Sequence, residues 1–287
     1  MAAATAAPSS SLAGRRALVT GASGAIGSAI ARRLAADGAT VLLHGHSRPE
    51  SLAALAAEIT AAGGRAEAVV FDLADDAAVA AACARLLEGG PVQIVVNNAG
   101  THDDAVFPGM RAAQWHRVID ISLNGFFRVT QPLVLPMLRT RWGRIINISS
   151  VAALAGNRGQ VNYAAAKGAL NSATKALAVE LASRGVTVNA IAPGIIESPM
   201  ATGGAAGSAA EGETGQAAAG ARPSSAAATA AAGKRGAAFD AEAIRRMVPA
   251  QRAGTPDEVA ALAGFLASPA AGYITGQVIS INGGLYC

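Results

Sequence analysis

The sequence has little of what marks several other classes of protein. Its 2 cysteines, Cys83 and Cys287, form no disulfide framework in 287 residues, so a reducing cytoplasm is the expected setting. Aromatic residues make up 4% of the chain, and the net charge of +4 includes no basic run, so nucleic-acid binding is not expected. No apolar stretch reaches the roughly 18 residues of a membrane span. What is present is a chain that is 52% hydrophobic and has the length of one large α/β domain.

Two segments of low complexity differ from the rest of the chain. Residues 1–13 are rich in Ala and Ser, with no Arg or Lys before Arg15, which predicts a disordered tail and not a signal or transit peptide. Of the 36 residues 201–236, 29 are Ala, Gly, Ser or Thr. Such a composition cannot bury enough apolar surface to offset the entropy of ordering. The domain is therefore predicted to span residues 14–287, with a flexible insertion at 201–236.

A glycine-rich turn follows the first apolar run of the chain. Residues 16–20 read as a buried strand, residues 21–27 (GASGAIG) as a turn, and residues 28–35 as an amphipathic helix. Strand, glycine turn and helix in this order are typical of dinucleotide binding. The glycines let the backbone approach a pyrophosphate, and the helix N-terminus offers free N–H groups to the anion. The turn is predicted to bind a dinucleotide through Gly21, Ser23, Ala25, Ile26 and Gly27.

The same alternation of strand and helix continues along the chain. Strands are predicted at residues 39–43, 66–71, 93–96, 145–148, 187–191 and 277–281, and helices at 51–62, 79–87, 126–138 and 164–181. This order predicts a single-domain, Rossmann-type, doubly wound parallel sheet in three α/β/α layers. Ligands of such sheets bind beyond the carboxyl ends of the strands. The residues expected at those ends are the glycine turn, Asp72, Asn97, Ser150 and the pair Pro193-Gly194.

Three side chains form a candidate proton-transfer group. Tyr163 and Lys167 are four positions apart, so on a helix they share one face, and Ser150 precedes Tyr163 by 13 positions. An ammonium beside a phenol lowers the phenol's pKa, and a tuned phenol can act as a general acid or base. The alternative is a buried Tyr with a neighbouring Lys and no chemistry. The Ser hydroxyl, from a strand end, could orient a carbonyl.

With these motifs together, the chain resembles the short-chain dehydrogenases/reductases, and in particular the 3-oxoacyl-[acyl-carrier-protein] reductases. The motifs that carry the resemblance are the glycine turn, Asn97-Asn98-Ala99-Gly100, Ser150 with Tyr163 and Lys167, Pro193-Gly194, and residues 273–276 followed by 282–284. The resemblance implies that Tyr163 donates a proton to the substrate carbonyl, that Lys167 binds the nicotinamide ribose and lowers the pKa of Tyr163, and that Ser150 bonds the carbonyl. It further implies cofactor contacts at Asp72, Leu73, Asn98, Ala99, Gly100, Pro193, Gly194, Ile196 and Ser198.

The chain departs from the family pattern at two positions. Ser122 stands where the family usually has an Asn whose backbone carbonyl binds a water that relays protons to the Lys. Asn124 lies about 200° away around a helix of ~3.6 residues per turn, so it is not expected to substitute. Ala25 stands where the family usually has a glycine, which is tolerable if the backbone there is helical.

The end of the second predicted strand bears on the choice of nicotinamide cofactor. Members that bind NADH usually carry an acidic residue there, which bonds the ribose hydroxyls. This chain has His46, Ser47 and Arg48, and an Arg fork suits a 2′-phosphate. NADPH is therefore predicted in preference to NADH, although the alternative is a solvated loop without a role.

The resemblance also implies partners. Arg141 and Arg184 match positions at which oxoacyl reductases present basic side chains to acyl carrier protein, and Arg139 and Arg144 are near in sequence. Relatives are usually homotetramers. The function predicted is NADPH-dependent reduction of a 3-oxoacyl thioester on acyl carrier protein, in fatty-acid or polyene synthesis. The alternatives are a dehydrogenase of a small alcohol, sugar or steroid, or a weakly catalytic NADPH-binding subunit.

Overall fold

The computed structural model describes residues 11–197 and 241–287. Within them, seven strands form one parallel sheet in the order β3-β2-β1-β4-β5-β6-β7. The strands are β1 (Arg16–Val19), β2 (Thr40–Gly45), β3 (Arg65–Val70), β4 (Ile94–Asn97), β5 (Gly143–Ile148), β6 (Val186–Pro193) and β7 (Val278–Ile281). The predicted doubly wound parallel sheet is confirmed, because chain order reverses between β1 and β4 while every pairing is parallel.

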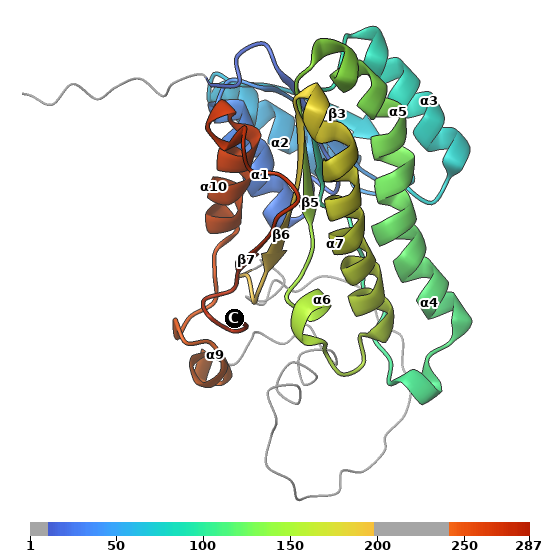
Figure 1. Cartoon of the computed structure of the whole chain (residues 1–287), viewed down its shortest axis with the longest axis vertical. Helices are drawn as coiled ribbons and strands as arrows, with labels where there is room; N and C mark the ends of the chain where they lie inside the picture. Colours follow the sequence, from blue (N-terminus) through green and yellow to red (C-terminus); the bar gives the residue numbers. More distant parts are fainter. Residues whose placement is uncertain (1–10, 198–240) are drawn as a thin grey trace, which may run out of the picture.

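Helices cover both faces of the sheet (Figure 1). On one face lie α1 (Ala25–Ala36), α2 (Pro49–Ala61) and α10 (Pro256–Ala267), whose apolar side chains share a core cluster with β1 and β2. On the other face lie α3 (Asp76–Glu88), α5 (Gly125–Thr140) and α7 (Val161–Leu181), which share a second cluster with β4, β5 and β6. The inner strands β1, β2, β4, β5 and β6 are buried on both faces, which explains why their sequences are mainly apolar runs without alternation. The edge strands β3 and β7 are largely exposed or only partly buried.

The remaining helices lie near the carboxyl ends of the strands. They are η1 (Phe107–Gly109), α4 (Ala112–Ile119), the π-helical η2 (Asp120–Asn124), α6 (Ala152–Ala155) and α9 (Ala241–Met247). Two further 3₁₀ turns, η3 (Ala182–Arg184) and η5 (Pro269–Ala271), end α7 and α10. The predicted long helix at 126–138 is confirmed as α5, which includes Pro132 and Pro136.

The start of the domain is earlier than predicted. Leu12, which the sequence placed in the tail, is fully buried in the cluster beneath α1, and its N–H donates to the carbonyl of Asp37. The rest of the predicted tail, the insertion at 201–236 and Ser198 lie outside the described residues.

None of the helices in residues 11–197 and 241–287 has both the length and the apolar character that crossing a bilayer requires.

Candidate active site

Two adjoining cavities open at the carboxyl ends of the strands. The first, of about 850 Å³, runs along the glycine turn and the ends of β2 and β4, and the second, of about 520 Å³, lies beyond the ends of β5 and β6. They share Ile26, Asn98, Gly100, Thr101 and Ile196 in their walls. A long ligand could therefore occupy the first cavity and place one end at the second.

Most of the predicted cofactor residues line the first cavity. These are Gly21, Ser23, Ala25, Ile26, Gly27, His46, Ser47, Arg48, Asp72, Leu73, Asn98, Ala99, Gly100 and Ile196. Tyr163, Lys167, Pro193 and Gly194 line the second cavity instead. The structure thus brings the residues together at one edge of the sheet, while their contact with a cofactor stays a prediction.

The glycine turn is shaped for close backbone approach. Gly21 has a φ of +65°, a conformation that favours glycine. A Cβ at Gly27 would lie 2.3 Å from the Gly21 carbonyl oxygen and 2.7 Å from Nδ2 of Asn98, so no side chain fits there. Ala25 is the first residue of α1, and its helical backbone tolerates the methyl group that replaces the family's usual glycine. The turn and the N-terminus of α1 therefore form a cradle suited to a pyrophosphate.

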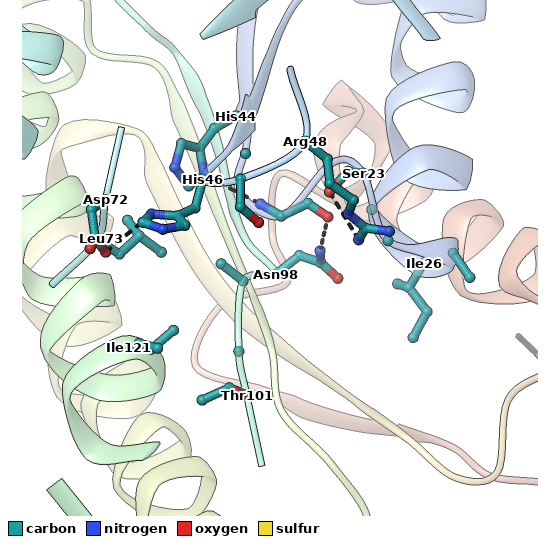
Figure 2. A pocket seen from close by; sticks show the side chains of 18 of the residues that line it. Ser23, Ile26, His44, His46, Arg48, Asp72, Leu73, Asn98, Thr101 and Ile121 are labelled. Carbon is teal, nitrogen blue, oxygen red and sulfur yellow. Dashed lines mark hydrogen bonds and ion pairs between the residues drawn. The ribbon is translucent and has the colours of Figure 1, made fainter. Parts of the chain in front are cut away.

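Asn98 holds this turn against the end of β4. Its Nδ2 donates to the carbonyls of Thr20 at 2.8 Å and Gly21 at 3.1 Å, while Oγ1 of Thr20 accepts from the backbone N–H groups of Asn98 and Ala99. Asn98 is thus a support of the turn as well as a wall residue (Figure 2).

His44 is a supporting residue that the sequence did not reveal. Its Nδ1 accepts from the N–H of Gly21 at 3.3 Å, and its Nε2 lies 3.0 Å from the carbonyl oxygen of Phe71. Burial lowers the pKa of His44 to about 4, so the ring is neutral at pH 7 and can accept from the turn. The bonds join the glycine turn to the end of β3. A histidine within a strand-like run gives no sequence signal of such a role.

Basic side chains gather where a 2′-phosphate was predicted. Arg48 donates to Oγ of Ser23 in the glycine turn at 3.4 Å, and His46 lies 3.5 Å from Asp72 (Figure 2). Arg48 therefore reaches the turn from the end of β2. The glycine turn at residues 21–27 has no basic residue of its own, so Arg48 supplies the guanidinium there.

Ser150, Tyr163 and Lys167 converge on the second cavity, as predicted. The hydroxyl groups of Ser150 and Tyr163 are hydrogen-bonded. The Lys167 ammonium lies 5.8 Å from the centre of the Tyr163 ring and donates to the carbonyl of Ile148, the last residue of β5, at 2.7 Å. The strand end and the first turns of α7 thus place a hydroxyl, a phenol and an ammonium along one wall.

The pKa values in this group differ from the prediction. The pKa of Tyr163 is raised: burial is the main cause, the hydrogen bond from Ser150 opposes it, and the Asp104 carboxylate adds to it. Burial also lowers the pKa of Lys167 to about 8. The expected lowering of the Tyr163 pKa is therefore not found in this arrangement, because burial of the phenol is the largest influence and the Lys167 ammonium is not among its causes.

Ser122 lies in the π-helical segment η2, close to Lys167. Its side chain is buried, and Oγ has no hydrogen-bond partner among the described residues. A Cβ built on Gly100 would lie 3.2 Å from Nζ of Lys167 and 3.5 Å from Oγ of Ser122, which places both groups around Gly100. The Asn124 amide donates to the Asp120 carboxylate, and that it cannot substitute for the family's Asn stays a prediction.

The predicted docking arginines lie at the opposite edge of the sheet. Arg141 precedes β5 and Arg184 precedes β6, so both mark amino ends of strands, and Arg141 bonds the carbonyl of Ser183. Both are exposed, as is Arg139. Arg144, which is near them in sequence, is 4% exposed, lies over the ring of Trp142 and bonds carbonyl groups, so it is not available to a partner.

Both polar and apolar side chains line the second cavity. The polar residues that the sequence analysis missed are His102, Asp104, Asn157 and Gln160, and the apolar ones include Ile195, Leu285 and Tyr286. Ile195 packs with Ile244 of α9 and with Val248, so α9 and the residues that follow it lie against this cavity. His102 and Asp104 lie just after the Asn97–Gly100 motif in the sequence, and this position is the signal that could have identified them as site residues.

Comparisons with known proteins agree with this arrangement. Residues 15–207 match the short chain dehydrogenase family, and residues 223–286 match a family described as enoyl-(acyl carrier protein) reductase. Nodulation protein G of Rhizobium sp. (strain N33) is 43% identical over 277 residues, which cover 96% of this chain and 98% of that protein. The 3-oxoacyl-[acyl-carrier-protein] reductase FabG of Pseudomonas aeruginosa is 39% identical over 279 residues, which cover 96% of this chain and 99% of that protein.

A solved structure is similar over nearly the whole chain. It comes from Agrobacterium tumefaciens, and its description assigns it provisionally as a gluconate dehydrogenase. The TM-score is 0.80 at 32% identity, with 96% of this chain and 98% of that chain covered. Its sheet and this one are therefore built alike.

Proposed function

The chain belongs to the short-chain dehydrogenase family, whose oxidoreductases act on CH–OH groups, and on this premise we propose that it reduces a 3-oxoacyl thioester on acyl carrier protein to the 3-hydroxyacyl thioester, with NADPH as reductant. The observation that carries the proposal is the convergence of Ser150, Tyr163 and Lys167 on the smaller cavity, which adjoins the larger cavity along the glycine turn. The sequence similarity to 3-oxoacyl-[acyl-carrier-protein] reductases supports the choice of substrate.

The residues present fit a nicotinamide dinucleotide. The absence of a side chain at Gly27 lets the glycine turn pack closely on α1, and the N-terminus of that helix suits a pyrophosphate. Arg48 with His46 would hold the 2′-phosphate, which supports NADPH in preference to NADH. Lys167 would hold the nicotinamide ribose. NADPH supplies the hydride, and the protein supplies position and polarity.

The protein's part in the reaction is to hold the ketone and to deliver a proton. The Ser150 hydroxyl, at the end of β5, orients the carbonyl oxygen. Burial keeps Tyr163 as a neutral phenol at pH 7, which is the form that donates a proton to the oxygen. Lys167, held by the carbonyl of Ile148, stands behind the phenol as the next group from which a proton can come. Ser122 lies next to Lys167 and would extend this relay.

The proposal includes docking of acyl carrier protein at Arg141 and Arg184. These arginines lie far from the cavity of their own protomer, which limits how docking can serve catalysis. Strand β6 has eight residues, so these arginines lie roughly 23 Å from its carboxyl end at ~3.3 Å per residue. A carrier bound there cannot easily serve the cavity of the same protomer. The role therefore requires a neighbouring protomer whose second cavity faces this edge.

Two other functions each have an observation in their favour. A dehydrogenase of a small alcohol, sugar or steroid is favoured by the similarity to the Agrobacterium tumefaciens structure and by the polar residues that line the second cavity. A weakly catalytic NADPH-binding subunit is favoured only by Ser122, which replaces the family's usual Asn. The presence of Ser150, Tyr163 and Lys167 argues against this function.

The test is a comparison of substrates. NADPH oxidation is followed with the N-acetylcysteamine thioester of 3-oxobutanoate, and NADP⁺ reduction with a panel of alcohols, sugars and steroids. The proposal predicts turnover of the thioester well above that of any panel member. Tyr163→Phe is the control: it should bind NADPH as the wild type does and lose roughly 10²- to 10⁴-fold in kcat. Faster turnover of a panel alcohol would establish the second function instead.

A further inference from the structure

A carboxylate is fixed in the wall of the second cavity, beside Tyr163. The segment that carries Asp104 is held against the start of α7 by three hydrogen bonds, at 2.9 to 3.0 Å. The Gln160 amide donates to Oδ2 of Asp104, the Asn162 amide donates to the carbonyl of Asp103, and the N–H of Ala105 donates to the carbonyl of Gly159. These bonds fix the position of the carboxylate relative to the start of the helix that carries Tyr163.

This negative charge is poorly balanced. The Asp104 side chain is 22% exposed, and the ion pair that the structure shows for it is with His102 at 3.5 Å. His102 is 70% exposed at the rim and carries charge only when it is protonated. Lys167 also lines the cavity, but its ammonium is buried on the Ile148 carbonyl.

The field of Asp104 reaches the reacting group. Asp104 and Tyr163 line the same cavity, and the carboxylate is one of the groups that raise the pKa of Tyr163. A second negative charge close to Tyr163 experiences the same repulsion. At a separation of ~6 Å and an effective dielectric constant of ~20, that repulsion corresponds to roughly 100-fold in binding.

We propose that Asp104 determines specificity by excluding carbonyl compounds that carry a negative charge near the reacting carbon. The site then takes neutral 3-oxo esters and thioesters and rejects 3-oxo acids and sugar acids. The inference rests on the proposed function, since it describes the substrate class of the same cavity. It also separates this chain from a dehydrogenase of sugar acids, whose substrates carry a carboxylate.

The test compares acetoacetate with methyl acetoacetate, which differ mainly in charge. In the wild type, kcat/KM for the ester should exceed that for the acid by roughly 100-fold. In Asp104→Asn, the ratio of kcat/KM for the ester to kcat/KM for the acid should fall by roughly 10- to 100-fold, through a lower KM for acetoacetate. The kcat/KM for the ester should stay within a few fold of the wild-type value. The Asn side chain keeps an oxygen to accept from Gln160.

The matched control is Asp103→Asn. The Asp103 carboxylate accepts from the Gln114 amide, and Asp103 is not among the residues that line the cavity. The same loss of charge one position away should therefore leave the ratio of kcat/KM for ester and acid unchanged. Equal loss of discrimination in both variants would overturn the proposal, because net charge alone would then explain it. If Asp104→Asn does not fold, equal use of acid and ester by the wild type would still overturn it.

Binding is measured beside turnover, from the fluorescence of NADPH on the enzyme. If the ester binds and the acid does not, but neither is reduced, the specificity proposal stands and the 3-oxoacyl reductase proposal fails. If both bind equally, or neither binds, the specificity proposal is overturned, because the cavity then does not select a neutral 3-oxo compound.

Discussion

At the scale of single residues, burial decides the protonation of the central pair. Desolvation disfavours the charged form of each group, so it raises the pKa of Tyr163 and lowers that of Lys167 to about 8. The i, i+4 spacing in the sequence predicted that both would lie on one face of a helix, and they do. The sequence could not predict that Lys167 would bond the Ile148 carbonyl, because that contact depends on how β5 meets α7.

Lys167 makes the stability of the protein depend on pH. Its pKa is about 8 in the folded protein and 10.5 in the ordinary case, so between these values the unfolded chain binds more protons and stability rises with pH. In Lys167→Met this contribution is absent. The unfolding free energy of the wild type should therefore gain about 3 kcal/mol relative to the variant between pH 8 and pH 10.5.

Urea unfolding of both proteins at a series of pH values gives the measurement. The comparison within each pH cancels the titration of other groups. A constant difference across this range would mean that Lys167 keeps an ordinary pKa.

At the scale of elements, the strands and most helices were predictable because their signals are local. Buried parallel strands are apolar runs, and the turn that follows β1 is marked by glycine. Other features depend on contacts between distant segments. Examples are the burial of Leu12 beneath α1, the bonds from His44 to Gly21 and Phe71, and the position of Asp104 against α7. No periodicity encodes such contacts.

The π-helical segment η2 gives a prediction at this scale. A buried hydroxyl without a partner costs free energy, so Ser122→Ala should not lower stability and should raise it by about 1 kcal/mol. Thermal or urea unfolding measures this. The same sample tests the relay: a fall in kcat of more than ~100-fold would show that the hydroxyl itself moves protons, since alanine keeps the backbone carbonyl. A clear loss of stability would contradict the absence of a partner.

At the scale of the whole molecule, the sheet separates two sets of residues by its own length. The cavities lie at the carboxyl edge and the exposed Arg141 and Arg184 at the amino edge. In the predicted homotetramer, the arginines of one protomer would lie near a cavity of another. Exposed apolar side chains support such an assembly: Phe127 and Leu135 on α5 are 64% and 55% exposed, and Val179 on α7 is 83% exposed. The sequence predicted these two helices but could not count subunits.

The central claim is that this molecule reduces a carrier-bound 3-oxoacyl thioester with NADPH. The most direct test follows the absorbance of NADPH with 3-oxobutanoyl-acyl carrier protein, with the N-acetylcysteamine thioester and with NADH in parallel. The account predicts fast oxidation of NADPH, slower oxidation of NADH, and a clear preference for the carrier-bound thioester. Tight binding of NADPH without oxidation by either thioester would contradict it.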